Sequence, residues 1–359
     1  MKAPLYSTLS QHTLECGNGN AGLWYDKYCN KWQLIQPDNP DIPYWSLGEQ
    51  KSEWIETVTG PVGVRGEIAE ACRRRQLLAE QIEGQSIAFS TQWRFVTGLG
   101  RQHPVENGFA WHPTLGIPYL PGPSVKGIIR AWAERWELND SESSTTTIER
   151  MFGPRGTESA GSIIVFDALP TEPVMLETDI MTPHYAPWYA DGDAPGDWHN
   201  PVPIPFLTVA KEQKFLFTVA PRCSDEQSQQ DVRTAIDYLK CALEWIGAGA
   251  KTAVGYGRMT QLDDDEQNKL ISAYLASDMD CEWVDQQLEE ISTAAHCTQA
   301  EALRGKILAT RWSELSSGDE KDNALACIKA RWDAKGWWED PPGRGARRVK
   351  NIYLTGGES

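Results

Sequence analysis

The sequence has no hydrophobic run long enough to cross a membrane. A bilayer-spanning helix needs about 20 consecutive apolar residues, and no stretch of the 359 residues approaches that length. The first twenty residues also lack the apolar core that is typical of a secretory signal peptide. We therefore expect a cytoplasmic protein with no membrane partner.

Cysteine and histidine patterns that hold metals are absent too. None of the eight cysteines has C-x-x-C spacing, and no HExxH or H-x-E motif occurs. Paired cysteines of that kind mark zinc and redox sites, and cytoplasmic thiols stay reduced. The sequence thus predicts free, mostly buried cysteines, with no metal and no cofactor.

Positive charge is scarce, with 34 Lys and Arg against 50 Asp and Glu and a net charge of −16. This balance excludes a protein that coats nucleic acid by bulk charge, because phosphate contacts depend on cations. Three windows differ from the rest: 88–133, 240–262 and 344–350 together contain 11 basic and 2 acidic residues. A narrow cationic strip is therefore compatible with the acidic total.

Phenylalanine is outnumbered by tryptophan, with 8 Phe against 16 Trp. Tryptophan combines a large apolar body with one N–H donor, which suits half-buried surfaces such as subunit contacts. With 40% hydrophobic and 23% charged residues, the chain has the composition of a globular protein. Its length allows about two domains, or one domain enlarged by insertions.

The middle of the chain, residues 87–262, predicts an α+β core. Residues 87–95 alternate between apolar and polar, as in a strand, and Ser124 can cap a helix with an apolar stripe. Further strands are expected at 162–167, 206–209, 214–220 and 253–260, with a helix at 226–246. The order β-α-β-β-α-β is ferredoxin-like, as in RNA-recognition motifs. Such a sheet carries two helices on one face and leaves the other face free, where related modules bind nucleic acid.

The segments before, within and after this core have different sequence patterns. Residues 1–86 are irregular, with ordered loops at 20–26 and 37–44 and one helix at 65–83. Residues 170–205 form a large insertion with room for a hairpin. Residues 263–359 form a helical extension that ends in the basic tail 344–350. Its helices are expected at 264–277, 280–292, 298–315 and 319–334.

A glycine-rich segment, GAGAKTAVGYGR at 247–258, is the first that could carry chemistry. Its glycines allow sharp turns and close approach of a ligand, and its N–H groups with Lys251 and Arg258 could hold phosphate. A P-loop is excluded, because Ala250 stands where that motif needs glycine before lysine, and the turn runs from helix to strand. A helix-capping glycine followed by a bulged strand stays open as a purely structural interpretation.

The second segment, 117–130, places a glycine turn beside a helix start, with Lys126 and Arg130 in the first turns. Cations at the positive end of a helix oppose its dipole, which favours an anion bound there. A capped helix with solvated cations is the structural alternative.

The third set consists of histidines and acids in the long loops. General acid–base chemistry or a metal site could be built from such groups, but no motif supports either, and satisfied structural histidines are the favoured interpretation. The acidic insertion could also act as a wedge through the apolar side chains of Tyr185, Trp188 and Tyr189. The loop set comprises His103, Glu106, His112, Asp179, His184, Asp197 and His199.

Together, LPGPSVKGIIR at 120–130 and GAGAKTAVGYGR at 247–258 resemble the RAMP superfamily of CRISPR-associated proteins. Within this superfamily, the chain resembles most specifically the sixth-subunit family of type III-B (Cmr) effector complexes. The segments that carry this resemblance are 95–122, 161–170, 179–185 and 197–209. The segment NAGLWYDKY at 20–28 fits the N-terminal part of that family. The resemblance covers about residues 20–260, and nothing is carried over to the last 100.

This resemblance implies a ferredoxin-like RAMP core that binds CRISPR guide RNA near its 3′ end and, through it, target RNA. The implied partners are other Cmr RAMP subunits and the small helical subunit. A different RAMP subunit cleaves the target with an aspartate in the loop after its first strand. Here that loop, 98–116, contains only Glu106, which favours a subunit with no catalytic residues.

The leading hypothesis is therefore a non-catalytic RNA-binding scaffold, with a ribonuclease using His103, His112, His184 or His199 and a purely protein-binding module as alternatives. Pro123 stands where the family usually has serine and removes one N–H donor to phosphate. The residues expected to contact RNA are Arg101, Gly122, Ser124, Lys126, Arg130, Gly249, Lys251, Thr252, Tyr256 and Arg258.

Overall fold

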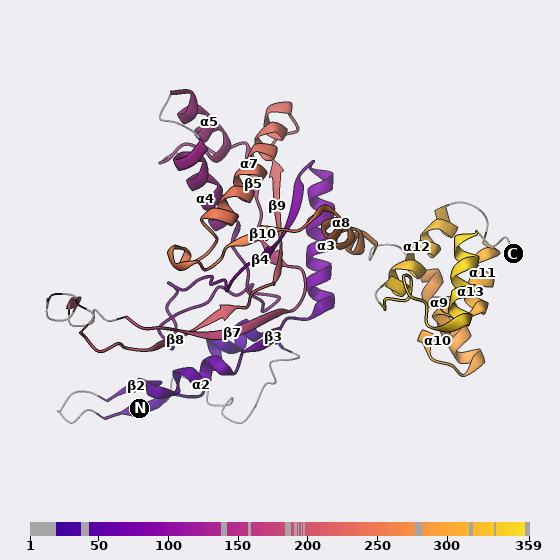
Figure 1. The fold of residues 1–359 in the computed structure, drawn as a ribbon, viewed down its shortest axis with the longest axis horizontal. Helices are drawn as coiled ribbons and strands as arrows, with labels where there is room; N and C mark the ends of the chain where they lie inside the picture. Colours follow the sequence, from indigo (N-terminus) through magenta and orange to yellow (C-terminus); the bar gives the residue numbers. More distant parts are fainter. Residues whose placement is uncertain are drawn as a thin grey trace. The chain divides into compact units, whose positions relative to one another are not determined.

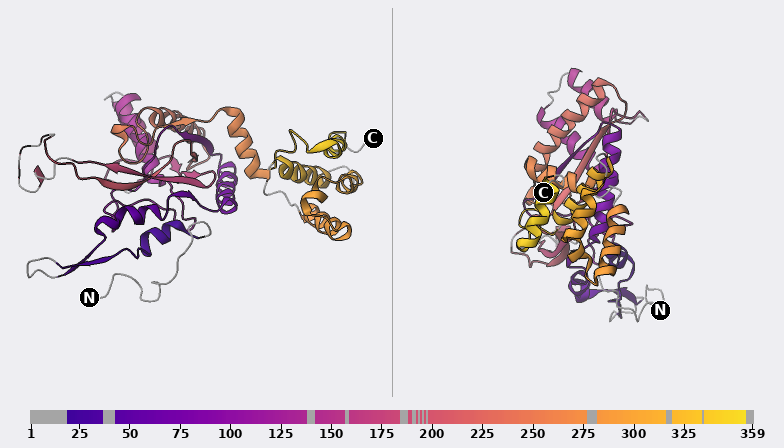
Figure 2. Two further views of the ribbon diagram at one scale, coloured as in Figure 1. Left: turned by 60° about the horizontal axis from the view of Figure 1, so that its bottom comes forward. Right: turned by 90° about the vertical axis from the view of Figure 1, so that its right-hand side faces the viewer.

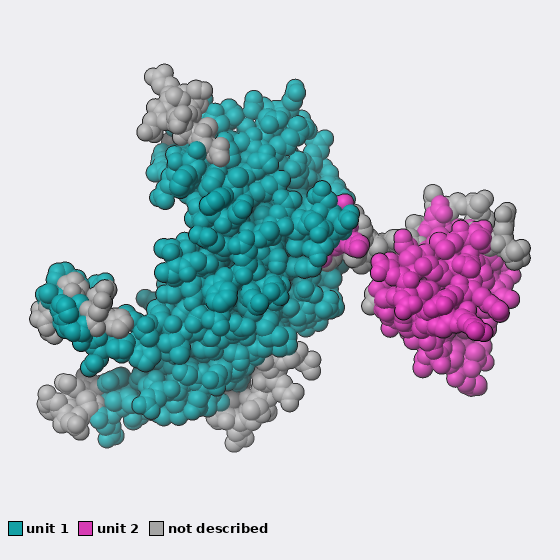
Figure 3. All heavy atoms as spheres, viewed as in Figure 1, with its two compact units in different colours: residues 1–267 teal, residues 268–359 magenta. Residues whose placement is uncertain are grey.

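The computed structural model forms two compact units, residues 1–267 and 268–359 (Figure 3). Each has its own hydrophobic core. The residues that the structure describes are 19–36, 43–137, 142–156, 159–183, 188–189, 192, 194, 196, 198–276, 282–315, 319–333 and 335–355.

The main sheet of the first unit is antiparallel and has the strand order β10-β4-β9-β5, with β6 also paired to β9. Helix α4 (Gly122–Trp132) lies between β4 and β5 in the chain, and α7 (Glu226–Trp245) lies between β9 and β10 (Figure 1). The strands are β4 (Gln85–Thr91), β5 (Ile163–Val165), β6 (Leu169–Pro170), β9 (Lys214–Pro221) and β10 (Met259–Gln261).

Helices α4 and α7 pack on each other and on one face of this sheet. Alternation along β9 turns Phe215, Phe217 and Val219 into the same core as Val232 and Leu239 of α7. The α7 helix begins with Asp225, whose side chain accepts a 2.8 Å hydrogen bond from the Ser228 N–H.

The other face of the sheet is covered, so the predicted free face is wrong. Helix α3 (Arg65–Gln81) packs against β4, β6 and β9. In the second set of β9 side chains, Leu216, Thr218 and Ala220 are at most 2% exposed. From the sequence, α3 is assigned to a separate N-terminal segment, because periodicity shows that a helix has an apolar face but not what that face packs on.

A second antiparallel sheet, β3-β7-β8, carries the predicted insertion. Strands β7 (Val174–Met181) and β8 (Ile204–Val209) form a long hairpin, paired from Leu176–Val209 to Met181–Ile204. Strand β3 (Gly60–Val62) adds to β7, and α2 (Lys51–Glu56) packs on the hairpin (Figure 2).

One N-terminal segment differs from its prediction. Residues 21–27 form helix α1 (Ala21–Lys27), not an ordered loop, because Asn20 caps it by accepting from the Leu23 N–H at 2.8 Å. The segment is too short for a periodic signal. The other elements of this unit are β1 (Gln33–Ile35), β2 (Tyr44–Ser46), the 3₁₀ turns Gly48–Gln50 and Thr252–Val254, the π-helix Ala133–Glu137, α5 (Glu142–Phe152) and α8 (Asp264–Ala276), whose last residues belong to the second unit.

The second unit is helical, as the sequence predicts. The basic segment 344–350 is not a tail but part of helix α13, which buries Ala346, Val349 and Tyr353. The helices wholly within this unit are α9 (Glu282–Ala295), α10 (Gln299–Leu303), α11 (Lys306–Ser313), α12 (Asp319–Asp333) and α13 (Gly343–Leu354).

The sequence predicts free cysteines and no membrane-spanning helix. Within the described ranges, no helix is long and apolar enough to cross a membrane. The expectation of thiols fails at Cys327, which is disulfide-bonded. Thiols are present at Cys29, Cys72, Cys223, Cys241 and Cys297.

Candidate nucleic-acid interface

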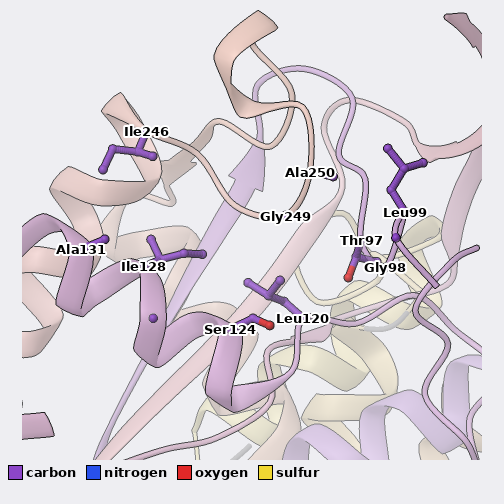
Figure 4. Close-up of a pocket in the computed structure, with 12 residues that line it drawn as sticks. Thr97, Gly98, Leu99, Leu120, Ser124, Ile128, Ala131, Ile246, Gly249 and Ala250 are labelled. Carbon is purple, nitrogen blue, oxygen red and sulfur yellow. The ribbon is translucent and has the colours of Figure 1, made fainter. Parts of the chain in front are cut away.

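A cavity of about 430 Å³ opens between α4, the loop after β4 and the glycine-rich segment (Figure 4). It brings together the two motifs singled out in the sequence, because Ser124 and Gly249 both line it. Its walls are largely aliphatic side chains and glycine backbone. The lining residues are Thr97, Gly98, Leu99, Gly100, Leu120, Ser124, Gly127, Ile128, Ala131, Ile246, Gly249 and Ala250.

Two glycines of the segment 247–258 are required by packing inside the protein. Gly249 has φ +80°, and a Cβ there would lie 2.0 Å from the carbonyl oxygen of Val96. Gly257 has φ +73°, and a Cβ there would lie 1.9 Å from the carbonyl oxygen of Ala248. The structural interpretation therefore holds for both glycines, which let the loop lie directly on the chain after β4.

The same loop keeps backbone donors available. Among the described residues, no acceptor binds the N–H groups of Gly249, Lys251 or Thr252. Gly249 and Lys251 are both left-handed, with Lys251 at φ +59°. Neighbouring N–H groups in such a turn form a concave site for anions.

Lys251 adds a positive charge beside these donors. Its Nζ lies 5.4 Å from the centre of the Phe206 ring and 4.0 Å from the Met181 sulfur. Both contacts are with uncharged groups, so the ammonium keeps its charge available for an anion. Because Met181 and Phe206 belong to the β7–β8 hairpin, Lys251 also joins the glycine-rich loop to that hairpin.

Tyr256 supports the loop through its hydroxyl group, which donates to Asp179 on β7. Arg94 donates to Asp179 at 2.7 Å and to Glu177 at 3.0 Å. Burial and the Asp179 carboxylate raise the pKa of Tyr256 to about 12. Burial alone would raise the pKa of Asp179, but hydrogen bonds from Tyr256, the Ile180 N–H and Arg94 lower it.

The start of α4 differs from the prediction. Ser124 makes no capping hydrogen bond; instead the Gly122 N–H donates to the Asp167 carboxylate at 2.6 Å. The Ser124 N–H is already bonded to the Pro121 carbonyl at 2.8 Å. This helix end is occupied by a carboxylate of the protein itself, so the predicted anion site at its N-terminus is wrong. Gly122 is buried, and a Cβ there would lie 2.5 Å from the Val165 carbonyl oxygen.

Lys126 and Arg130 do not line the cavity. Helical periodicity turns both of them away from the lining face of Ser124 and Gly127. Arg130 donates to Glu134 at 2.8 Å and to the Gly153 carbonyl at 3.2 Å. Burial lowers the pKa of Lys126, and the nearby charges of Arg222 and Arg130 lower it further.

The other two predicted cations are exposed. Arg101 directly follows the lining loop 97–100, and Arg258 follows Gly257 at the end of the glycine-rich segment. The structure therefore places Ser124, Gly249, Lys251 and Thr252 in or beside the cavity, and Arg101 next in sequence to its lining loop.

The histidines of the long loops do not converge. His103 stacks on Tyr25 at 4.3 Å, with Nε2 3.1 Å from the Tyr25 carbonyl oxygen. His112 Nδ1 accepts from the Leu115 N–H at 3.3 Å, and His199 Nε2 lies 3.1 Å from the Ala194 carbonyl oxygen. His184 and Asp197 lie outside the described residues.

The remaining acids of that set are held in ion pairs. Glu106 pairs with Lys51, and Asp179 pairs with Arg94. Within the described ranges, no group of three His, Cys, Asp or Glu side chains could hold a metal ion.

Gly127 also lines the cavity, although it is not among the site residues predicted from the sequence. It lies on the exposed face of α4, and no heavy atom stands within 4 Å of where its Cβ would be. Glycine inside a helix costs about 1 kcal/mol relative to alanine. The available signal was a glycine inside the motif 120–130, on an exposed helix face where no packing contact requires it.

Comparisons with known proteins identify the family. The sequence model of the RAMP superfamily matches residues 55–260, more than half of the chain. The Cmr subunit Cmr6 of Pyrococcus furiosus is 32% identical, and the match covers 48% of this chain and 66% of that protein. Cmr6 of Saccharolobus solfataricus is 30% identical, covering 42% and 47%. The matched region therefore spans roughly half to two thirds of these relatives.

Solved structures include similar chains. The crystal structure of Cmr6 from Pyrococcus furiosus has 29% identity and a TM-score of 0.31, covering 50% of this chain and 98% of that one. A chain of the Type III-B Cmr-beta complex bound to cognate target RNA has 22% identity and a TM-score of 0.48, covering 59% and 71%. From the superfamily match and the two sequence relatives, the chain is a member of the RAMP superfamily and a homologue of the CRISPR system Cmr subunit Cmr6.

Proposed function

We propose that this chain is a non-catalytic subunit of a type III-B (Cmr) complex that binds the CRISPR guide RNA near its 3′ end. Through the guide it meets target RNA, and it stacks against other Cmr RAMP subunits and the small helical subunit. Homology to Cmr6 supports this assignment. The cavity between α4 and the glycine-rich loop is the observation that carries it.

We further propose that the main sheet is a ferredoxin-like core. In chain order its strands are β4, β5, β9 and β10, and in space they lie as fourth, first, third and second. The helices α4 and α7 follow the first and third of these strands, which is the β-α-β-β-α-β arrangement. Since α3 covers the far face of the sheet, the RNA meets the edge of this core at the cavity.

The cavity offers what a nucleic-acid backbone requires. The N–H groups of Gly249, Lys251 and Thr252, with the Lys251 ammonium, are placed to contact phosphate oxygens. The aliphatic wall that includes Leu99 and Ile128 suits the faces of sugar and base. The absence of a side chain at Gly127 lets the RNA backbone approach α4 closely.

The non-catalytic assignment is supported by the environment of the candidate acid–base groups. His103 is stacked and buried, Glu106 is paired with Lys51, and Asp179 accepts from Tyr256 and Arg94. Each side chain thus has a structural partner. Incubating the chain with guide precursor and target RNA, with and without divalent metal, tests the ribonuclease alternative; cleavage lost on substituting one histidine would support it.

The β7–β8 hairpin is proposed as a thumb. Beyond the paired strands, Trp188, Tyr189 and Trp198 are 47%, 82% and 76% exposed. Exposed aromatic side chains can stack on bases or pack on a protein neighbour. Because Lys251 and Tyr256 tie this hairpin to the glycine-rich loop, RNA in the cavity and the hairpin would act as one site.

A charge placed at Gly127 tests the proposed site. The Gly127→Glu change puts a carboxylate into the cavity, where phosphate should be repelled, while improving helix propensity. We expect at least a tenfold weaker affinity for single-stranded guide RNA, measured by fluorescence anisotropy on the full chain. The Gly127→Gln variant fills the same space without the charge, so we expect it to weaken binding less than Gly127→Glu, and the difference between the two variants measures the repulsion of phosphate.

Equal affinities of the Glu and Gln variants, with both near wild type, would place the RNA elsewhere. Equal and strong losses in both variants would show that shape rather than charge governs the cavity. Circular dichroism of both variants verifies that α4 is intact.

A further inference from the structure

The second unit carries a surface that the RAMP match does not include, since that match ends at residue 260. Trp337 and Trp338 are adjacent residues in the turn between α12 and α13, and both are half-buried. Their edges pack on the buried Trp332, with ring centres at 6.3 Å and 6.0 Å. The two indoles are thereby held in fixed positions at the surface.

Four cations lie over these two rings. Arg304 and Lys335 stand 5.7 Å and 5.4 Å from the centre of the Trp337 ring. Lys329 and Lys350 each stand 5.6 Å from the Trp338 ring. These side chains come from the end of α10, from α12, from the turn and from α13, so folding gathers charges that are dispersed in the sequence.

None of the four cations forms an ion pair within the described residues, although Glu301 lies near Arg304, and Asp333 lies near Lys329 and Lys350. Lys350 donates to the Trp338 carbonyl oxygen. Glu339 also lies nearby. Even so, residues 329–350 contain seven basic and three acidic residues, whereas 282–303 contain five acidic and no basic residues.

Helix α13 extends the positive surface. It buries Ala346, Val349 and Tyr353 and leaves Arg344, Arg347 and Arg348 exposed. Lys350 lies one turn from Arg347, so the arginines continue the cluster around Trp338. The only ion pair of these arginines in the described residues is a 3.9 Å contact of Arg347 with Asp340, both largely exposed, which contributes little.

The position of these arginines is electrostatically unfavourable for the isolated helix. They lie in the first two turns of α13, at the positive end of its dipole. Pro342 precedes the helix and no side chain caps it. Cations and uncapped N–H groups at the same helix end are complementary to a bound anion.

We propose that this cationic–aromatic surface, formed by Trp337, Trp338, Arg304, Lys329, Lys335, Lys350 and the α13 arginines, binds single-stranded RNA. The cations contact phosphates, and when a cation leaves its indole ring for a phosphate, the ring face that it uncovers stacks on a base without regard to sequence. Charge alone would suit an acidic protein equally well, but two adjacent surface indoles within the charge cluster favour a ligand with aromatic faces. The surface is independent of the cavity near Gly127.

The α13 arginines provide the test, because they are exposed and their removal leaves the helix core intact. We measure binding of fluorescein-labelled oligouridine to the full chain across a salt series. Arg344→Ala, Arg347→Ala and Arg348→Ala combined should weaken binding at least tenfold at low salt. They should also reduce the slope of log affinity against log salt by about 2, since each lost phosphate contact accounts for about 0.7.

The control is a triple alanine variant of Arg74, Lys211 and Arg233, three exposed cations of the first unit. It makes the same change in net charge and should leave the slope within about 0.5 of wild type. If both triple variants lowered the affinity and the salt slope equally, net charge alone would explain the loss of binding, and the proposal would be overturned.

Photocrosslinking of oligouridine containing 4-thiouridine, mapped by mass spectrometry, separates this proposal from the proposed function. Crosslinks to 335–350 that disappear in the α13 variant support the second surface. Crosslinks confined to 120–130 and 247–258 would overturn the second-unit surface and support the cavity. Crosslinks confined to 335–350 would overturn the cavity and support the second-unit surface. RNA binding unchanged by the α13 variant, with loss of a co-purifying acidic protein, would assign the surface to protein and also overturn the proposal.

Discussion

At the residue scale, His103 shows how burial decides the role of a histidine. It is stacked on Tyr25, and burial lowers its pKa. A histidine whose folded pKa is depressed stabilises the protein above its unfolded pKa, near 6.5, and this contribution is lost as the pH falls below it. We therefore expect the urea concentration at the unfolding midpoint of the first unit to decrease as the pH is lowered from 7.5 to 5.

His103→Gln isolates this contribution. The variant keeps a polar side chain but no group that titrates in this range, so its midpoint should depend less on pH than that of wild type. Part of the dependence should remain, because burial lowers the pKa of His112 as well. Parallel pH profiles for variant and wild type would exclude His103 as a source of acid sensitivity.

The chemistry of the candidate site could be predicted residue by residue only in part. Gly249, Lys251 and Ser124 were found because unusual residue types cluster in short motifs. Their partners could not be found this way, because Asp167, between β5 and β6, and Asp179, on β7, reach the motifs from distant parts of the chain. Lys126 lies on the side of α4 that is turned away from Ser124 and Gly127, and its contact with RNA stays a prediction.

At the element scale, periodicity predicts the long elements well. The alternation after residue 86 marks β4, and the helices α3, α4 and α7 lie where apolar stripes predict them. Short elements such as α1 and β10 are held by tertiary contacts and leave too few residues for a period. The covering of the sheet by α3 could not be predicted, because periodicity shows that a helix has an apolar face but not what covers that face.

The glycine-rich loop yields a prediction about an element. Gly249 and Gly255 are both left-handed, at φ +80° and +97°, but only Gly249 has a backbone atom where a Cβ would be; nothing lies within 4 Å at Gly255. Alanine costs roughly 1–2 kcal/mol at either position through the dihedral angle alone. At Gly249 the clash with Val96 should add about 1–3 kcal/mol.

Urea unfolding of Gly249→Ala and Gly255→Ala measures this difference. The two variants remove the same residue type from the same loop, so the excess loss at Gly249 reports the packing of the loop on Val96. Equal losses at both positions would mean that this close approach does not exist in solution.

At the scale of the whole molecule, the net charge of −16 does not describe the parts that matter. Cations gather at 329–350 in the second unit and beside the cavity in the first, while the hairpin segment 156–210 has eight acids and no lysine or arginine. A chain with a net negative charge and local positive surfaces repels nucleic acid over most of its surface, while the positive surfaces can still bind it at defined positions. Because such a chain contacts few phosphates, its RNA affinity should depend less steeply on salt than that of a protein that coats nucleic acid.

The two separate cores predict two separable unfolding units. Phe217 belongs to the core of the first unit and Trp332 to that of the second, and both are at most 1% exposed. Truncating either to alanine should cost about 3–5 kcal/mol within its own unit. Hydrogen exchange followed by mass spectrometry on the full chain should show Trp332→Ala increasing exchange in 282–355 and Phe217→Ala increasing it in 85–262. If either change accelerated exchange equally in both ranges, the chain would unfold as one cooperative unit, and RNA bound at α13 would stabilise the cavity as well.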